Sequence, residues 1–254
     1  MSTATSIPIL ETRALTKSFA GFVAVKDVSL RIREGAIHAL IGPNGAGKTT
    51  LFNLLTKFLR PTRGQILYDG QDITHMRPSR LARAGIARSF QISAIFPNLT
   101  VLENVRIALQ RGHRSPYNFW RSQHAVRDLD APARCLLADV GLENFADRRA
   151  AELAYGGKRA LELATTLALK PKVLLLDEPM AGLGLEETSR ITALIRNAAK
   201  GRTVVLVEHN LGVVANLSDE ITVLQRGEIL ASGSYREVSQ KPEVIEAYMG
   251  TGDV

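Results

Sequence analysis

The chain has 254 residues and a formal net charge of +7, and its composition excludes several classes of protein. Hydrophobic residues make up 45% of it and charged residues 22%, which is ordinary for a soluble globular protein and excludes disorder along the whole chain. The length suits one large α/β domain or two small ones. The longest aliphatic run, Val173 to Leu176, is far below the ~20 apolar residues of a membrane span, so any membrane role is expected to be peripheral.

The ends and the cysteine content add two exclusions. Residues 1–8 lack a basic start followed by an apolar core, so we expect no secretory signal. Cys135 is the only cysteine, which excludes an intrachain disulfide, and we expect it to be a small buried residue. The basic balance suits nucleic acid, anionic lipid or a small polyanion, and by itself it does not choose among them.

The first third of the chain predicts β structure followed by a helix. Apolar positions of roughly period two lie between residues 23 and 32, and residues 37–41 predict a buried strand that a glycine follows at once. From Lys48 the apolar spacing becomes helical, with a stripe that extends to Phe58, and Pro61 is expected to end this helix.

The remainder predicts alternating elements. After a strand at 65–68, residues 92–147 predict helices interrupted by prolines, Pro132 among them. The later predicted elements are a helix near 159–169, a strand at 173–176, a helix at 186–199 and a strand at 203–207. Helices that alternate with short apolar strands favour one α/β core with a mostly parallel sheet, covered on both faces, and a helical insertion in its middle.

A glycine-rich loop lies between the strand at 37–41 and the helix that starts at Lys48. Its residues are Gly42, Pro43, Asn44, Gly45, Ala46, Gly47, Lys48, Thr49 and Thr50, and residues 42–49 match G-x-x-x-x-G-K-[ST]. Glycines let consecutive N–H groups wrap phosphate oxygens, and the helix aims its positive end at the same anion. Lys48 adds a positive charge for the β and γ phosphates, and Thr49 adds a hydroxyl for magnesium. The motif predicts a nucleoside triphosphate site, although many unrelated NTPases share it.

Two carboxylates follow the aliphatic strand at 173–176. In a parallel sheet, strand ends of one sense line the ligand crevice. Asp177 is therefore placed to bind magnesium, directly or through water. Glu178 points differently along the alternating chain and can orient or activate the water that attacks the phosphate.

Two further polar residues acquire meaning only from their order in the chain. His209 follows the strand at 203–207, where it could contact the γ-phosphate, although a lone histidine there is more often an ordinary turn residue. Gln91 could reach the magnesium or the attacking water, and alone it indicates almost nothing.

The order of phosphate loop, Gln91, a glycine-containing helix start near 153–158, Asp177-Glu178 and His209 resembles the ABC ATPase family over nearly the whole chain. The resemblance implies a P-loop NTPase core with a mostly parallel sheet, an N-terminal antiparallel β subdomain and an inserted helical subdomain. It also implies that Glu178, His209, Gln91 and Lys48 are catalytic, and that Thr49, Gln91 and Asp177 bind Mg²⁺ beside ATP.

The same resemblance implies an organisation of the domain. A single ABC ATPase domain would span 9–250, with 1–8 and 251–254 as flexible ends. Residues 92–151 and the helix after them would form the helical subdomain that contacts a permease. Phe19 matches the aromatic residue that stacks on adenine, and Gln91 matches the loop that couples nucleotide state to the membrane partner.

Two segments depart from the family pattern. The family signature is Leu-Ser-Gly-Gly-Gln, and this chain has Leu153 followed by Ala154, Tyr155, Gly156 and Gly157. This register keeps residues 161–164 aligned, whereas a shift by one would place Gly156 and Gly157 on the glycine pair. Ala154 lacks the serine hydroxyl that meets the γ-phosphate across a dimer, but the helix N-terminus remains. Gly184 stands where the family has aspartate or asparagine, which helps two subunits communicate.

Within the family, the chain looks most like the ATPase subunits of branched-chain amino acid uptake systems. The residues that support this are 19–25, 153–156, 161–164 and 244–250. This implies a head-to-tail pair of ATPase subunits, homo- or heterodimeric, with multispanning permease subunits and a solute-binding protein. It implies a peripheral location on the cytoplasmic face of the inner membrane, and no nucleic acid partner.

Other functions remain open from the sequence. Urea, short amide and aromatic acid importers carry similar subunits, as do lipopolysaccharide exporters. A soluble ABC ATPase or a nucleotide-dependent assembly factor is the non-transport alternative. The transported solute is not encoded in this chain.

Overall fold

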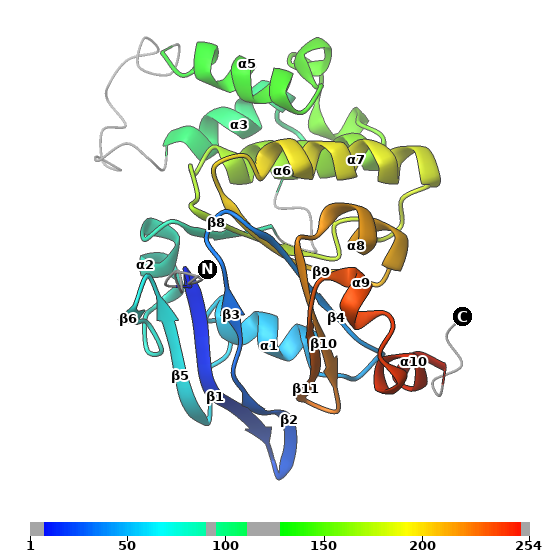
Figure 1. Ribbon diagram of the computed structural model, residues 1–254. Helices are drawn as coiled ribbons and strands as arrows, with labels where there is room; N and C mark the ends of the chain where they lie inside the picture. The colour runs from blue at the N-terminus through cyan, green and yellow to red at the C-terminus, as the bar shows by residue number, and fades with distance from the viewer. Residues whose placement is uncertain (1–7, 90–94, 111–127, 250–254) are drawn as a thin grey trace, which may run out of the picture. The chain divides into compact units, whose positions relative to one another are not determined.

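The computed structural model describes residues 8–89, 95–110 and 128–249 (Figure 1). The chain divides into two compact units. Unit 1 comprises Met1–Ile86, Lys172–Glu178 and Ala199–Val254, and unit 2 comprises Ala87–Pro171 and Pro179–Ala198. Gln91 lies outside the described residues, as do 1–7 and 251–254 of the ends expected to be flexible.

Unit 1 contains an antiparallel sheet with the order β2-β1-β5-β6, in which β3 also pairs with β1. Its strands are β1 (Leu10–Phe19), β2 (Phe22–Val28), β3 (Arg31–Ile32), β5 (Arg63–Tyr68) and β6 (Gln71–Asp72). The antiparallel N-terminal part implied by the resemblance is therefore confirmed. The period-two pattern missed β1, because Arg13 and Ala14 are both exposed, Leu15 and Thr16 are both buried, and Ala14 has φ 44°.

The second sheet has the order β11-β10-β4-β9-β8-β7. Its strands are β4 (Ile37–Ile41), β7 (Ile86–Arg88), β8 (Val173–Asp177), β9 (Thr203–Val207), β10 (Glu220–Gln225) and β11 (Glu228–Gly233). The pairs β10–β4, β4–β9 and β8–β9 are parallel, and β11 is antiparallel to β10. The prediction of a mostly parallel sheet is confirmed, with β4 and β9 at their predicted bounds.

Helix α1 (Lys48–Leu55) lies in one hydrophobic core with residues from both sheets of unit 1. Phe52 is fully buried there, together with Leu10 of the antiparallel sheet and Leu40 of the parallel sheet. Because α1 leads directly out of the glycine-rich loop, this packing fixes the direction in which the loop's N–H groups point.

Two expectations about the end of α1 are wrong. The helix ends at Leu55, well before Pro61, because Lys57 adopts a left-handed backbone conformation with φ 65°. Phe58 therefore leaves the apolar stripe and is 54% exposed.

Unit 2 is built mainly from helices. Its longer helices are α3 (Val101–Gln110), α5 (Asp130–Asp139), α6 (Tyr155–Leu167) and α7 (Leu185–Ala198), with short 3₁₀ turns at Glu143–Phe145 and Ala150–Glu152. Helix α3 packs against α5 and α6, and α6 packs against α7. The predicted helical insertion is confirmed in the described part of this unit.

Helix α5 corrects two expectations. Pro132 does not interrupt a helix but lies in the first turn of α5, where no backbone N–H is needed. Cys135 is exposed rather than buried. Leu129, Ala133 and Leu137 form the buried face at a spacing of four, and Cys135 lies on the other side of the helix.

The remaining helices of the described residues belong to unit 1. They are α2 (Pro78–Arg83), α8 (Leu211–Leu217), α9 (Tyr235–Val238) and α10 (Pro242–Met249), and Figure 1 shows α9 and α10 following β11. A capping box formed by Ser234 and Glu237 starts α9. No helix in the described ranges has the length and apolar character needed to cross a bilayer.

His38 makes the stability of unit 1 sensitive to acid. The imidazole is buried within the parallel sheet, its Nε2 lies 2.9 Å from the Thr222 hydroxyl, and its Nδ1 lies 3.9 Å from a carboxylate oxygen of Glu220. Burial lowers the pKa of His38 to about 4, against a favourable effect of Glu220. Between pH 6.5 and about pH 4 the unfolded chain therefore binds a proton that the folded chain does not, so stability falls as the pH falls through this window.

We expect the His38→Gln variant to lose less stability than the parent on acidification. The parent should lose about 3 kcal/mol more than the variant between pH 6.5 and pH 4. Urea unfolding at a series of pH values measures this difference. Equal pH dependence in the two proteins would show that His38 does not carry the effect.

Candidate functional site

The glycine-rich loop in unit 1 needs glycine at two positions for different contacts. Gly42 has φ 145°, and a Cβ atom there would lie 2.1 Å from the carbonyl oxygen of Leu224 in β10. Gly47 is the N-cap of α1 with φ 99°, and its Cβ would lie 2.5 Å from the carbonyl oxygen of Ala24. These close approaches fix the loop against the strands behind it, so that the N-terminus of α1 forms one wall of an anion site.

Lys48 lies against its own loop. Its Nζ donates hydrogen bonds to the carbonyl oxygens of Gly42, at 2.6 Å, and Pro43, at 2.9 Å. Burial lowers the pKa of Lys48, while the nearby Glu178 carboxylate opposes that shift. The side chain thus brings a desolvated positive charge to the start of α1, where phosphate oxygens would be its natural partners.

Asp177 and Glu178 occupy the carboxyl end of β8. Asp177 is only 2% exposed, whereas Glu178 is the first residue beyond the strand and has φ 48°. A left-handed conformation is unusual for glutamate and is stabilised here by the hydrogen bond from the Glu178 N–H to the carbonyl oxygen of Val207, at 3.0 Å. The two adjacent carboxylates therefore differ in environment: that of Asp177 is buried, and that of Glu178 is partly exposed.

His209 and Glu178 meet at the ends of neighbouring parallel strands. A carboxylate oxygen of Glu178 lies 2.7 Å from Nε2 of His209, and the imidazole side chain remains 45% exposed. The backbone N–H of His209 donates to the Glu208 carboxylate at 3.1 Å, and Asn210 then caps α8. The histidine is therefore fixed between β9 and α8, with its ring on the carboxylate predicted to activate water.

The donor set at this end of the sheet fits Mg²⁺. Thr49 in the first turn of α1 offers an exposed hydroxyl, and Asp177 offers a buried carboxylate. Magnesium prefers oxygen ligands and usually takes only one or two from the protein, the rest coming from phosphate and water. The described residues contain no group of three or more His, Cys, Asp or Glu side chains that would form a complete metal cage. Gln91, the other predicted ligand, lies outside these residues.

Phe19 ends β1 with its ring 42% exposed. Nζ of Lys17 lies 4.9 Å from the ring centroid. Phe22, at the start of β2, is even more exposed, at 70%. The hairpin between β1 and β2 therefore carries two aromatic side chains, of which Phe19 has a cation against its ring.

The signature segment lies in unit 2 at the start of α6. Ala154 is the N-cap and provides no side-chain hydrogen bond, as its methyl group requires. The Tyr155 hydroxyl accepts a hydrogen bond from Arg159 at 2.8 Å, and the Gly156 N–H donates to a carboxylate oxygen of Glu187 at 3.1 Å. Gly157 is also in the first turn of α6. A side chain at Gly184, the other departure, would meet no atom within 4 Å.

Sequence reasoning missed a contact between the phosphate loop and α10. Burial raises the pKa of Tyr248 in α10 to about 12, and a hydrogen bond with the backbone of Gly42 opposes that shift. No pattern in the sequence links these two distant residues. Sequence reasoning missed Glu208 and Glu187 as well, although Glu208 directly precedes His209 and Glu187 lies three residues after Gly184.

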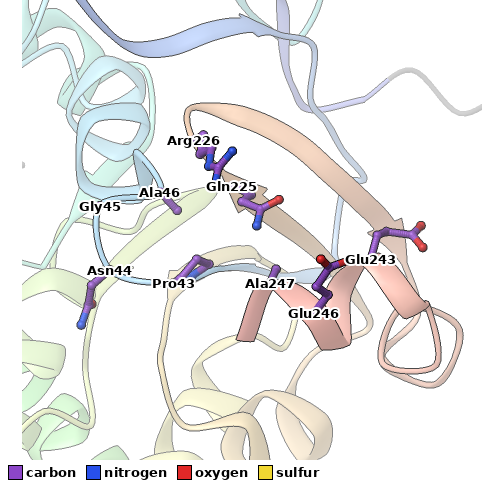
Figure 2. A pocket seen from close by; sticks show the side chains of 9 residues that line it. All are labelled: Pro43, Asn44, Gly45, Ala46, Gln225, Arg226, Glu243, Glu246 and Ala247. Atoms are coloured by element: carbon purple, nitrogen blue, oxygen red, sulfur yellow. The ribbon is translucent and has the colours of Figure 1, made fainter. Parts of the chain in front are cut away.

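A pocket of ≈ 450 Å³ lies beside the phosphate loop, between that loop and α10 (Figure 2). The residues that line it are Pro43, Asn44, Gly45, Ala46, Gln225, Arg226, Glu243, Glu246 and Ala247. The lining includes neither Lys48 nor Asp177, and the negative charges of Glu243 and Glu246 would repel a phosphate. This hollow therefore shares residues 43–46 with the phosphate loop but is not lined by the side chains predicted to bind the terminal phosphates and the magnesium.

Comparison with known proteins identifies the class. Residues 25–181 match the ABC transporter family. The chain belongs to this family and is an ATP-binding, ATP-hydrolysing subunit. A crystal structure of an ATP-binding cassette in its ADP conformation is 33% identical, has a TM-score of 0.84, and matches over 96% of this chain and 100% of that one. A nucleotide-free cassette is 32% identical with a TM-score of 0.82, over 94% of this chain and 98% of that one.

Relatives with assigned roles are similar over their full length. The chain is 40% identical to the high-affinity branched-chain amino acid transport ATP-binding protein BraF of Pseudomonas aeruginosa, over 96% of this chain and 99% of the relative. It is 38% identical to the corresponding protein LivG of Escherichia coli, with the same coverage. A probable LivG of Methanocaldococcus jannaschii is 34% identical, over 96% and 98%.

Proposed function

We propose that this chain is the ATPase subunit of an importer for branched-chain amino acids or related small polar solutes. The observation that carries the proposal is the 38–40% identity to BraF and LivG over 96% of the chain. In this proposal the subunit lies on the cytoplasmic face of the membrane, bound to multispanning permease subunits, and a solute-binding protein delivers the solute. A single ABC ATPase domain at 9–250 supplies the energy, with 92–151 and α6 as the part that contacts the permease.

The hydrolytic site in this proposal is composite. Residues 42–50 bind the triphosphate of ATP, with Lys48 on the β and γ phosphates. Glu178 accepts a proton from the attacking water, and His209, at 2.7 Å from that carboxylate, orients it and contacts the γ-phosphate. Ala154, Tyr155, Gly156 and Gly157 of a second subunit complete the site through the N-terminus of α6.

Magnesium is the proposed metal of this site. Asp177 and Thr49 would hold it, with Gln91 as a further ligand. When bound, the ion supplies positive charge that neutralises the phosphates and the leaving group. The protein's own part is to present a buried carboxylate at the end of β8 and a hydroxyl at the start of α1.

Phe19 is the proposed adenine contact. We expect Phe19→Ala to weaken ATP binding about tenfold, because stacking of a base on an aromatic ring contributes about 1–3 kcal/mol. Phe22→Ala is the matched control, since it removes a ring that is even more exposed from the same hairpin. Titration with a fluorescent ATP analogue measures both. Equal losses in the two variants, or no loss in Phe19→Ala, would contradict the assignment of Phe19.

Reconstitution tests the transport function. The chain should co-purify with a multispanning permease, and liposomes containing the complex should accumulate leucine when ATP, Mg²⁺ and the binding protein are supplied. Urea and an aromatic acid serve as alternative solutes, and a Glu178→Gln complex serves as the control that cannot hydrolyse ATP. Failure of the chain to co-purify with any permease would overturn the transport function, and uptake of only urea or only the aromatic acid would overturn the proposed substrate class.

A further inference from the structure

Glu187 makes an unassigned contact with the signature segment. It lies in the first turn of α7, and its Oε1 accepts a hydrogen bond from the Gly156 N–H at 3.1 Å. Both residues belong to unit 2, where α6 and α7 pack side by side (Figure 1). The contact therefore places a carboxylate on the backbone amide at the start of the signature helix.

The start of α6 lacks a partner from its own sequence. Ala154 provides no side-chain cap, and the first turn of α6 contains no acidic residue. Helix N-termini favour an acceptor on their first N–H groups and negative charge near their axis. Glu187 provides both from a neighbouring helix, in place of the serine that the family pattern has at Ala154.

Gly156 is what allows the carboxylate to come so close. A Cβ atom at Gly156 would lie 2.4 Å from Oε1 of Glu187 and 2.9 Å from its Cδ. The loop before α7 approaches the same segment, since a Cβ at Gly182 would lie 3.4 Å from the ring of Tyr155. Two contacts thus connect the signature segment with the loop that follows Glu178 and with the start of α7.

We propose that Glu187 is a positioning residue whose carboxylate occupies the Gly156 amide until the γ-phosphate of ATP on a second copy of the chain replaces it. This inference rests on the composite site of the proposed function. The Glu187 carboxylate and the γ-phosphate compete because each is an anion that accepts a hydrogen bond from the same N–H group, and their charges repel at close range. Arrival of the γ-phosphate therefore expels Glu187 from the helix start.

Replacement of Glu187 by the γ-phosphate at the Gly156 N–H couples the signature segment to the loop before α7. Gly184 has no side chain for the communication that aspartate or asparagine serves elsewhere in the family. Release of Glu187 frees the start of α7, and with it the loop after Glu178, only when a second subunit delivers ATP. The contact thereby couples dimer closure to the segment beside the hydrolytic carboxylate.

The test uses ATP-dependent dimerisation of the full chain in a Glu178→Gln background, which slows hydrolysis. Glu187→Gln keeps a hydrogen-bond acceptor for Gly156 and removes the charge. We expect the ATP concentration at half-dimerisation to fall about fivefold, equivalent to about 1 kcal/mol for one charge at a helix terminus. Glu186→Gln is the matched control, because it removes the same charge from the preceding residue of the same turn. Light scattering measures dimerisation, and thermal unfolding reports the fold of each variant.

The outcomes separate the inference from the function on which it rests. A parent that remains monomeric at saturating ATP would overturn the composite site and this inference together. A parent that dimerises, with Glu187→Gln unchanged or needing more ATP, would overturn the role of Glu187 alone. The same fivefold shift in Glu186→Gln would show a general charge effect and also reject the specific contact. ATP binding to monomers at the phosphate loop should be equal in all variants.

Discussion

Replacing Glu178 with glutamine is expected to slow ATP hydrolysis by about a thousandfold while ATP still binds. A positioned general base contributes about 10²–10⁴ in rate, and the glutamine amide cannot accept the proton. The side chain keeps its length and its place at the end of β8, 2.7 Å from His209 in the parent. Phosphate release under saturating ATP measures the rate, and equilibrium titration measures the affinity.

Glu186→Gln is the appropriate control for that experiment. Glu186 is an exposed acid in the first turn of α7, and its loss should leave hydrolysis nearly unchanged. Hydrolysis by Glu178→Gln at the parent rate would show that another group activates the water. Loss of ATP binding together with hydrolysis would show instead that the charge of Glu178 maintains Lys48 in its position.

The second large effect is expected at Lys48. Replacement with methionine preserves a buried side chain of similar length but removes the ammonium that lies on the carbonyl oxygens of Gly42 and Pro43. Hydrogen bonds to charged groups contribute about 1.5–3 kcal/mol each, so loss of the contacts to the β and γ phosphates should weaken ATP binding about a hundredfold. Calorimetric titration with ATP checks this value.

AMP and a surface lysine provide the controls for Lys48. AMP lacks the β and γ phosphates, so its affinity should be the same in Lys48→Met and the parent. Lys200→Met removes an exposed charge of unit 1 and should leave ATP affinity unchanged. An equal loss of ATP and AMP binding in Lys48→Met would mean that the loop had lost its conformation, rather than a contact to the terminal phosphates.

Local patterns in the sequence were sufficient to predict those elements whose ends depend only on their own residues. Strands β4 and β9 are uniformly buried, so five apolar residues bounded by turns predicted them at their observed ends. Strand β1 was missed because half of it is paired irregularly, with register shifts between Leu15 and Lys17 and between Lys17 and Ser18. Phe58 was misplaced because the left-handed turn at Lys57 leaves no mark in the apolar spacing.

The candidate site likewise contains parts that the sequence predicts and parts that only the tertiary structure reveals. The phosphate loop and the pair Asp177-Glu178 are contiguous, and each is recognisable from its residue types alone. The contact between Glu178 and His209 depends on the pairing of β8 with β9, which the alternation of elements suggested but could not specify. The contacts of Glu187 with Gly156 and of Tyr248 with Gly42 join residues on separate helices and loops, and only the tertiary structure reveals them.

The hydrogen bond between Gly42 and Tyr248 has a consequence for the order in which the protein matures. A ribosome synthesises the phosphate loop well before helix α10. Until α10 has been synthesised, the backbone of Gly42 therefore lacks its tyrosine partner. The outer side of the loop is completed only when α10 docks. A nascent chain can thus form both sheets of unit 1 before its nucleotide site acquires its final form. For the same reason, a bulky fusion placed directly after α10 would disturb the contact of α10 with the phosphate loop and thereby change the affinity for ATP.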